Sequence, residues 1–227
     1  MHKFILFDID QTLIESGGGG LSAMTRAFEE ITGIADGFNG ISYGGKTDPQ
    51  IIREALEAHG LSADDNILKR LIEVYLRHFP AEMAIKRGRV KPGVRKLVER
   101  IHQSGVLHLG LLTGNVEAGA RIKLEHFGLY EYFLAGAFGS DGEDRNVLLP
   151  IAVRRFRQRT GIQVDHRDCI VVGDTPRDVE CARAHGTPCI GTATGAYSQA
   201  DLTMAGADLV VEDLTGTEAI IEWIASV

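Results

Sequence analysis

Polar side chains follow short apolar runs at four places in this sequence. The four polar segments are 8–12, 113–115, 141–145 and 173–178. In the first, Asp8 and Asp10 are separated by one residue directly after the apolar run Phe4 to Phe7. Two carboxylates at the end of a strand can face one ligand where the strand gives way to a loop. Because like charges repel, such a pair favours a bound cation.

A third carboxylate, Asp174, stands in the last of these segments. Together the three aspartates form a set of hard oxygen ligands that suits octahedral Mg²⁺, which retains waters and takes a phosphate oxygen. One such aspartate alone would be interpreted as a helix cap or a surface residue, but three at the ends of two predicted strands, with matched polar groups at other strand ends, indicate a site. The three cysteines form no CxxC pair and are predicted to be reduced core thiols, so a metal would be held by oxygen.

Short, continuous apolar runs predict the strands that position these residues. The runs are 4–7, 106–112, 169–172, 189–190 and 209–211. Such runs are typical of strands buried on both faces of a parallel sheet. Helical patterns separate them, as in the apolar stripe from Val94 to Ile101, and the alternation predicts a doubly wound, Rossmann-like α/β sheet. Ligands bind beyond the carboxyl ends of the strands in such sheets.

The segment between the first strand and this α/β region contains only helical periodicity. We expect residues 16–86 to form a helical cap that opens with four glycines, and residues 1–15 and 87–227 to form the core. Asp48 as N-cap with Pro49 at the first helical position predicts the start of one cap helix. Lys46, in the loop before this helix, is a candidate substrate contact; a lone loop lysine is also commonly only solvated.

Composition narrows the possible partners. The chain has 227 residues, enough for one large domain or a domain with a modest insertion, and its 24 Lys plus Arg against 31 Asp plus Glu give a net charge of -7. Nucleic acid is therefore not the expected partner. The first residues are too few and too soon interrupted by Asp8 to form a signal peptide, and no stretch predicts a membrane span. We expect a cytoplasmic protein with no membrane partner; its oligomeric state is not predicted.

The motifs resemble those of the haloacid dehalogenase-like superfamily, and in particular its phosphatases with a helical cap in the first insertion position, such as phosphoglycolate phosphatase. The first motif of that family matches Phe4 to Thr12, the second matches Leu109 to Thr113, and the fourth matches Gly173 to Asp178. In the third motif Arg145 stands where relatives usually have lysine. An arginine keeps the positive charge but is a planar fork rather than a point charge. Residue 11, often glycine in the family, is Gln11.

The resemblance implies a role for each matched residue. Asp8 would attack phosphorus and form an aspartyl-phosphate, and Asp10 would protonate the leaving oxygen and then activate water. Phosphate-binding and metal-binding roles are implied for several more residues: Thr113, Gly114, Asn115 and Arg145 for the phosphoryl group, and Asp8, Asp10 and Asp174 for Mg²⁺. Asp178 would support the site or add a ligand. The implied function is a magnesium-dependent phosphatase acting on a small phosphorylated metabolite.

Several alternatives remain open at this point. A phosphosugar mutase of the same superfamily uses the same aspartates and returns the phosphoryl group to a sugar hydroxyl. A dehalogenase is disfavoured because that branch lacks the second aspartate, and a phosphonate hydrolase with a Schiff-base lysine is disfavoured by Asp10, although Lys46 keeps it open. Outside the enzymes, a receiver-like signalling domain or a non-catalytic phosphate-binding scaffold is the alternative.

Overall fold

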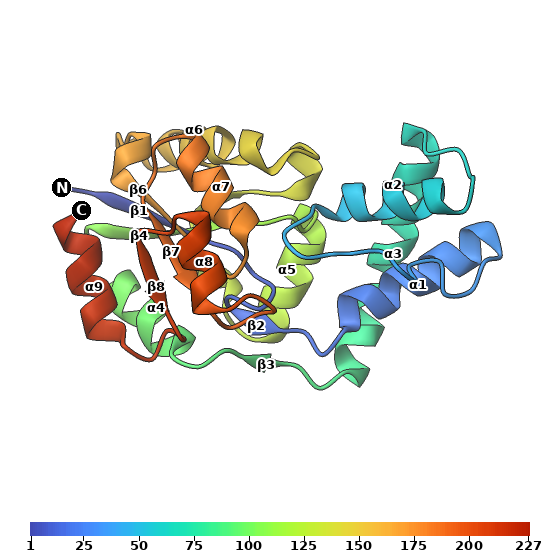
Figure 1. The fold of residues 1–227 in the computed structure, drawn as a ribbon, viewed down its shortest axis with the longest axis horizontal. Helices are drawn as coiled ribbons and strands as arrows, with labels where there is room; N and C mark the ends of the chain where they lie inside the picture. The colour runs from blue at the N-terminus through green and yellow to red at the C-terminus, as the bar shows by residue number, and fades with distance from the viewer.

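A sheet of six parallel strands forms the centre of the larger lobe (Figure 1). The computed structural model describes all 227 residues of the chain. The strands are β1 (Lys3–Phe7), β4 (Leu107–Leu112), β5 (Ala135–Ala137), β6 (Cys169–Gly173), β7 (Cys189–Thr192) and β8 (Leu209–Val211). Their order in the sheet is β5-β4-β1-β6-β7-β8, and every neighbouring pair is parallel. The prediction of a doubly wound sheet is confirmed.

Helices cover both faces of this sheet because alternate strand residues are apolar on both sides. In β1, Ile5 and Phe7 belong to one core cluster and Phe4 and Leu6 to the other. The helices packed on the first cluster are α4 (Val94–Gln103), α5 (Glu117–His126) and α9 (Thr217–Ser226). Those on the second are α6 (Leu148–Thr160), α7 (Pro176–Ala184) and α8 (Gln199–Ala205). Short 3₁₀ helices span Tyr130–Tyr132, Gly139–Asp141, Arg145–Val147 and His166–Asp168.

Three helices form the smaller lobe, which is the inserted cap (Figure 1). They are α1 (Gly19–Thr32), α2 (Asp48–Ala58) and α3 (Asp65–Ile85). Their apolar faces enclose a separate core that includes Phe28, Leu56 and Tyr75. The chain leaves the larger lobe through β2 (Ile14–Glu15) and returns through β3 (Arg89–Val90), and these two short strands pair antiparallel.

The structure corrects the predicted start of the second cap helix. Asp48 is the first residue of α2, and Thr47 is the N-cap, with its hydroxyl accepting a hydrogen bond from the Gln50 N–H at 3.3 Å. The Asp48 carboxylate instead accepts from the Val116 N–H of the larger lobe at 2.9 Å, and the Asp48 N–H donates to the Gly114 carbonyl at 2.7 Å. These two bonds tie the cap to the core.

Two further expectations concern the cysteines and the membrane. Cys169, Cys181 and Cys189 are free and buried, as expected for core thiols. None of the helices combines the length and the apolar character needed to cross a membrane.

Candidate active site

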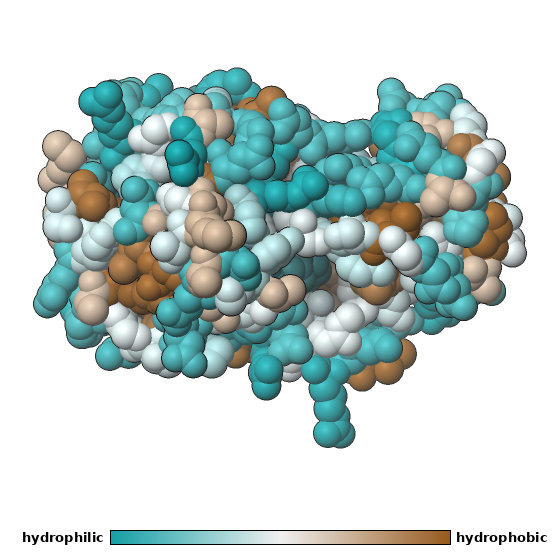
Figure 2. Space-filling model, viewed as in Figure 1, coloured by the Kyte–Doolittle hydropathy of each residue, from teal (hydrophilic) through white to brown (hydrophobic).

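The carboxyl ends of the three central strands meet where the strand order reverses. β1 lies between β4 and β6, and Phe7 at the end of β1 is level with Leu111 on one side and Val172 on the other. The residues that follow these three strands therefore lie close together at the carboxyl edge of the sheet. Ligands bind at this position in doubly wound sheets. A cavity of about 400 Å³ lies there, between the sheet and the cap. The surface is hollowed where the two lobes meet (Figure 2).

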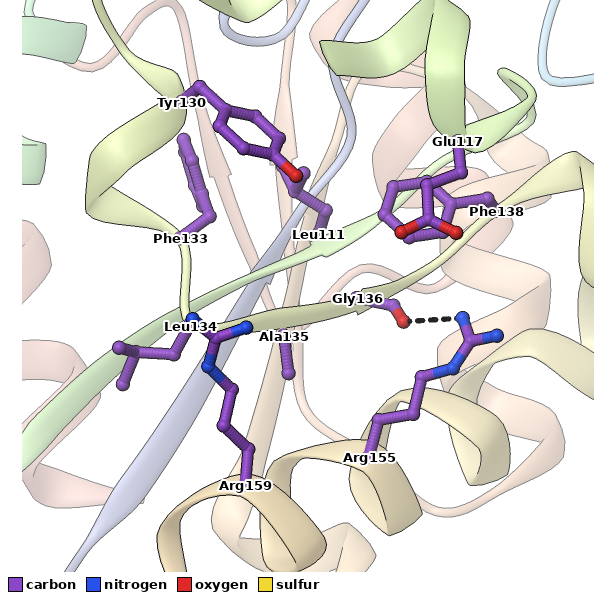
Figure 3. Close-up of a pocket in the computed structure, with 10 residues that line it drawn as sticks. All are labelled: Leu111, Glu117, Tyr130, Phe133, Leu134, Ala135, Gly136, Phe138, Arg155 and Arg159. Atoms are coloured by element: carbon purple, nitrogen blue, oxygen red, sulfur yellow. Dashed lines mark hydrogen bonds between the residues drawn. The ribbon is translucent and has the colours of Figure 1, made fainter.

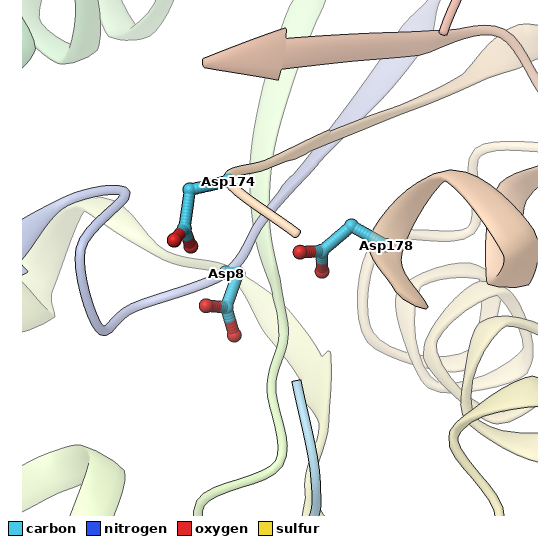
Figure 4. Close-up of side chains that lie close together, drawn as sticks. All are labelled: Asp8, Asp174 and Asp178. Atoms are coloured by element: carbon cyan, nitrogen blue, oxygen red, sulfur yellow. The ribbon is translucent and has the colours of Figure 1, made fainter. Parts of the chain in front are cut away.

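Three aspartates point toward one another at this end of the sheet (Figure 4). One carboxylate oxygen from each of Asp8, Asp174 and Asp178 lies within 4.8 Å of the others, and all three residues are buried. A cluster of hard oxygen donors of this kind fits Mg²⁺ better than a soft metal. The Asp10 carboxylate is not in this cluster, and its Oδ2 accepts hydrogen bonds from Asn115 and Lys123 instead.

The electrostatics of the cluster also fit a cation. Burial raises the pKa of Asp8 from 3.8 to about 6. The positive charge of Arg145 lowers this pKa, and the negative charge of Asp178 raises it further. Burial and the neighbouring charges of Asp178 and Asp8 raise the pKa of Asp174 to about 8. Carboxylates that resist ionisation in this way are stabilised as anions by a bound cation. Asp8 Oδ1 accepts a hydrogen bond from Arg145, and Asp174 Oδ1 accepts one from Thr12. The Oδ2 atom of each aspartate has no hydrogen-bond partner in the chain.

Asp178 differs from these two because both of its oxygens are engaged. Oδ2 accepts from the N–H of Thr175 at 3.0 Å and from the Thr175 hydroxyl at 2.7 Å, which caps α7, and Oδ1 accepts from Arg145. The carboxylate lies against Gly173, where a Cβ atom would come within 2.1 Å of it. The glycine of the motif therefore makes room for this side chain.

Arg145 is a buried cation between two of the aspartates. Its Nη2 donates to Asp8 Oδ1 at 3.1 Å, to the Leu112 carbonyl at 3.0 Å and to Asp178. Burial lowers the pKa of this guanidinium, but the negative charges of Asp178 and Asp8 outweigh burial and raise it. Its Nε is buried without any partner. Arg145 also lines the cavity, so a buried positive charge borders the space in which an anion would lie.

The segment Thr113-Gly114-Asn115 lines the same cavity or lies against it. The Gly114 N–H has no partner in the chain, and a Cβ at this position would lie 2.1 Å from the Lys46 carbonyl of the cap loop. The side chains of Thr113 and Asn115 are hydrogen-bonded to each other at 2.8 Å. Asn115 also donates to Asp10 Oδ2 at 2.8 Å, so its side chain positions that carboxylate.

Lys123 is a site residue that the sequence analysis missed. Its ammonium lies 2.6 Å from Asp10 Oδ2, and only 6% of the side chain is exposed. A signal was present in the sequence, because Lys123 occurs seven residues after Val116 and three after Ala120, on the apolar stripe of α5. A lysine on a buried stripe indicates an internal charge partner.

Two other buried side chains support the loop after β1. Thr12 ends the first sequence motif but was given no role of its own, and Lys91 was not singled out from the sequence. Thr12 donates to Asp174 Oδ1 at 3.1 Å. Lys91 donates to the Gln11 side chain at 2.8 Å and to the Thr194 carbonyl at 2.7 Å. Gln11 has φ 63°, a left-handed conformation that glycine adopts more readily than other residues. These contacts hold a non-glycine residue in that conformation.

Lys46 lies at the cavity, but its ammonium is already paired. It donates to Glu54 of α2, and the exposed fractions of the two side chains are 13% and 33%. The loop that carries Lys46 packs closely on the core, since a Cβ on Gly45 would lie 2.7 Å from the Thr175 hydroxyl. The lysine is therefore near the site without being free in it.

A second pocket, of about 380 Å³, lies at the β5 edge of the sheet (Figure 3). Tyr130 and Phe133 line one side, and Arg155 and Arg159 of α6 line the other. Arg155 is paired with Asp141 and donates to the Gly136 carbonyl at 2.9 Å. The aspartate cluster is not part of this pocket, so the candidate active site is the cavity under the cap.

A buried aspartate after β1, a buried guanidinium beside it and an acidic cluster lie at the switch point of a doubly wound sheet, and this arrangement fits a hydrolase of the capped α/β type. Comparison with known proteins agrees. Residues 2–186 match the family model described as haloacid dehalogenase-like hydrolase. The chain belongs to this family.

Similar proteins include curated phosphatases and solved structures. The chain is 28% identical over 218 residues to a phosphoglycolate phosphatase of Rhodospirillum rubrum, which covers 94% of this chain and 88% of the relative. It is 28% identical over 199 residues to a phosphoglycolate phosphatase of Mesorhizobium japonicum, with 86% and 84% covered. A predicted phosphatase from Clostridium acetobutylicum has a similar fold, with a TM-score of 0.75, 23% identity, and 98% and 99% of the two chains covered.

Proposed function

We propose that this hydrolase is a phosphatase that uses Mg²⁺ to remove the phosphoryl group from a small phosphorylated metabolite, through an aspartyl-phosphate at Asp8. The observation that carries the proposal is the convergence of Asp8, Asp174 and Arg145, all buried, at one cavity. 2-Phosphoglycolate is the first substrate to test, because the similar curated proteins are named as phosphoglycolate phosphatases. The cytoplasm is the proposed location, and three reduced cysteines are compatible with it.

The metal-binding residues in this proposal are Asp8 and Asp174, through carboxylate oxygens, and Asp10, through its backbone carbonyl. The unpartnered Oδ2 atoms and raised pKa values of Asp8 and Asp174 support this assignment. Bound Mg²⁺ would supply positive charge that offsets the repulsion between the carboxylates and the phosphoryl group. Both oxygens of Asp178 already accept hydrogen bonds, so we assign it first to holding Arg145 and α7 in place, and a further metal ligand is its alternative role.

Phosphoryl transfer would occur in two steps, formation of the aspartyl-phosphate and its hydrolysis. In the first, a carboxylate oxygen of Asp8 forms a bond to phosphorus, the bond from phosphorus to the leaving oxygen breaks, and that oxygen takes a proton from Asp10. In the second, a water gives a proton to Asp10 and attacks phosphorus, and the bond to Asp8 breaks. The N–H of Gly114, Thr113, the Asn115 N–H and the Arg145 guanidinium would bind the transferring group.

The cap would select the substrate. We propose residues 16–86 as the cap and residues 1–15 and 87–227 as the core, with Lys46 contacting the leaving group when it exchanges Glu54 for an anionic or polyhydroxy substrate. The placement of the Lys46 loop against Gly114 supports this role.

A single series of assays tests the function. Phosphate release from 2-phosphoglycolate, from other phosphorylated metabolites and from p-nitrophenyl phosphate is measured with Mg²⁺, with a chelator and with Ca²⁺. We expect turnover with Mg²⁺, none with the chelator, and inhibition by Ca²⁺, which prefers a higher coordination number and could take both oxygens of Asp8. Turnover that is equal with and without the chelator would refute metal dependence, and no phosphate release from any substrate would refute the phosphatase.

A further inference from the structure

Lys123 is the most deeply buried ammonium at the mouth of the cavity, and no step above uses it. It comes from α5 of the core, and the cap covers it on the other side. Its Nζ lies 5.7 Å from the centre of the Phe79 ring of α3, and a Cβ on Gly20 of α1 would lie 3.5 Å from Nζ. A lysine with 6% of its side chain exposed needs a compensating charge, and here that charge is Asp10.

The partners of Lys123 form a closed triangle of hydrogen bonds. Its ammonium donates to Asp10 Oδ2 and to Asn115 Oδ1, and Asn115 Nδ2 donates in turn to the same Asp10 Oδ2 at 2.8 Å. Two donors therefore fix one oxygen of the Asp10 carboxylate. The other oxygen, Oδ1, has no partner in the chain, and Asp10 lines the cavity. Asp10 Oδ1 is therefore the oxygen that can exchange a proton with a leaving group or a water.

We propose that Lys123 is a positioning residue for the reaction: its ammonium, held by Asn115 and covered by the cap, fixes the Asp10 carboxylate so that Oδ1 faces the leaving oxygen. The proposal rests on the proposed phosphatase function. Without the ammonium, Asp10 keeps a single hydrogen bond from Asn115 and can turn about its side-chain bonds. Misplacement of a catalytic group by about 1 Å can cost about 100-fold in rate.

A direct role of Lys123 in binding the substrate is the competing explanation. The ammonium already has two oxygen acceptors and an aromatic ring around it, so an anionic substrate group would have to displace one of them. The two roles give different kinetics. If Lys123 binds the substrate, removing its ammonium should weaken the affinity for substrates that carry a second anionic group. If Lys123 positions Asp10, removing it should slow catalysis for every substrate whose leaving oxygen needs a proton.

The leaving group provides the readout that a merely structural role would not change. The nitrophenolate of p-nitrophenyl phosphate departs without a proton, whereas the alkoxide of 2-phosphoglycolate or of glycerol 2-phosphate needs one. These two alkyl phosphates differ in that only the first carries a carboxylate. Because kcat/KM reports the first step only, a displaced Asp10 lowers it for alkyl phosphates and spares it for the aryl phosphate.

The test compares Lys123→Met with the wild type and with Arg121→Ala, a change at an exposed residue of the same helix that pairs with Glu125. We expect Lys123→Met to lower kcat/KM by about 100-fold for both alkyl phosphates and by less than about fivefold for p-nitrophenyl phosphate. Lys123→Arg, which keeps a cationic donor, should retain alkyl phosphate activity within about tenfold of the wild type. Arg121→Ala should leave all three substrates unchanged.

Three results would overturn the proposal: an equal loss on aryl and alkyl phosphates, no loss on either, or a rise in KM confined to the substrate with a carboxylate. Thermal unfolding of each variant establishes that it is folded, and Lys123→Gln replaces the methionine variant if that variant does not fold. Absence of turnover in the wild type would instead refute the phosphatase function, so the two failures are distinguishable.

Discussion

The strand-end aspartates and the cap lysine reach the same cavity but are held in different ways. Asp8 and Asp174 follow central strands, are buried, and are fixed by Arg145 and Thr12 of the core. Lys46 is on a loop, and its charge is neutralised by Glu54 of the cap itself. The core therefore fixes Asp8 and Asp174, whereas the contact of Lys46 with Glu54 can change without moving these two aspartates. Changes at Asp8 and Asp174 should affect all substrates equally, and changes at Lys46 should affect them unequally.

The largest effect is expected from Asp8→Asn. The amide cannot attack phosphorus, and loss of a nucleophile costs about 10⁴-fold or more in turnover. The loss should be the same for an alkyl and an aryl phosphate, because both need the nucleophile. Phosphate-release assays on both substrates measure it, with circular dichroism to verify the fold. Near-normal activity on either substrate would remove Asp8 from the mechanism.

Asp178→Asn should cause the next largest effect. It should lower both the free energy of unfolding and the phosphatase activity. The Asp178 side chain is 0% exposed and Arg145 is 7% exposed, so removing one charge leaves a buried cation with one partner fewer. Breaking a buried ion pair costs about 3 kcal/mol or more. Urea unfolding measures the change in free energy. A variant as stable as the wild type would show that Asp8 alone is a sufficient partner for Arg145.

Magnesium should stabilise the protein more at high pH than at low pH. The pKa values of Asp8 and Asp174 are raised from 3.8 to about 6 and about 8. An acid whose pKa is higher in the folded state stabilises the metal-free fold below its unfolded pKa, and this contribution is lost as the pH rises through 6 and 8. Mg²⁺ binds the ionised carboxylates, so the gain in Tm on adding it should be greater at about pH 8.5 than at about pH 5.

Thermal unfolding with and without Mg²⁺ at both pH values checks this expectation. Asp174→Asn is the matched control, and it should show little gain from Mg²⁺ at either pH. An equal or smaller gain at the higher pH would mean that the aspartates are not the metal ligands.

The smallest effect is expected from the cap. Lys46→Ala should lower kcat/KM for the best metabolite by about tenfold, since a charge-assisted contact contributes about 1.5–3 kcal/mol and the ammonium must first leave Glu54. p-Nitrophenyl phosphate, which offers the cap no group to bind, should change by less than about twofold. Lys69→Ala, at an exposed cap position, is the control. A uniform loss on both substrates would contradict a selective role.

The same division between core and cap explains how far the sequence predicts this molecule. Asp8 and Asp174 follow apolar runs whose strand character is local, so both their burial and their convergence follow from the pattern. β5 was not predicted because its three residues, Ala135 to Ala137, have no strong strand preference and are placed by pairing with β4.

The contacts between cap and core depend on how the cap is seated, which local patterns do not contain. Asp48 was predicted to cap its own helix, but its carboxylate bonds to Val116, 68 positions away in the chain. Thr47 is able to take over the cap because its hydroxyl makes the same local bond. Lys123 could have been found, since a charged residue on the apolar stripe of a core helix requires a buried partner, but the identity of that partner, Asp10, needed the fold.

In the proposed mechanism, Asp8 carries the phosphoryl group during turnover. The most direct test is to mix the protein with substrate and Mg²⁺, stop the reaction with acid during the steady state, and locate any added phosphoryl group by peptide mass spectrometry. We predict the mass of one phosphoryl group on the peptide that contains Asp8, and none on that peptide in Asp8→Asn or without Mg²⁺. A phosphoryl group on another residue, or turnover with no phosphorylated protein under conditions that trap acyl phosphates, would contradict the account.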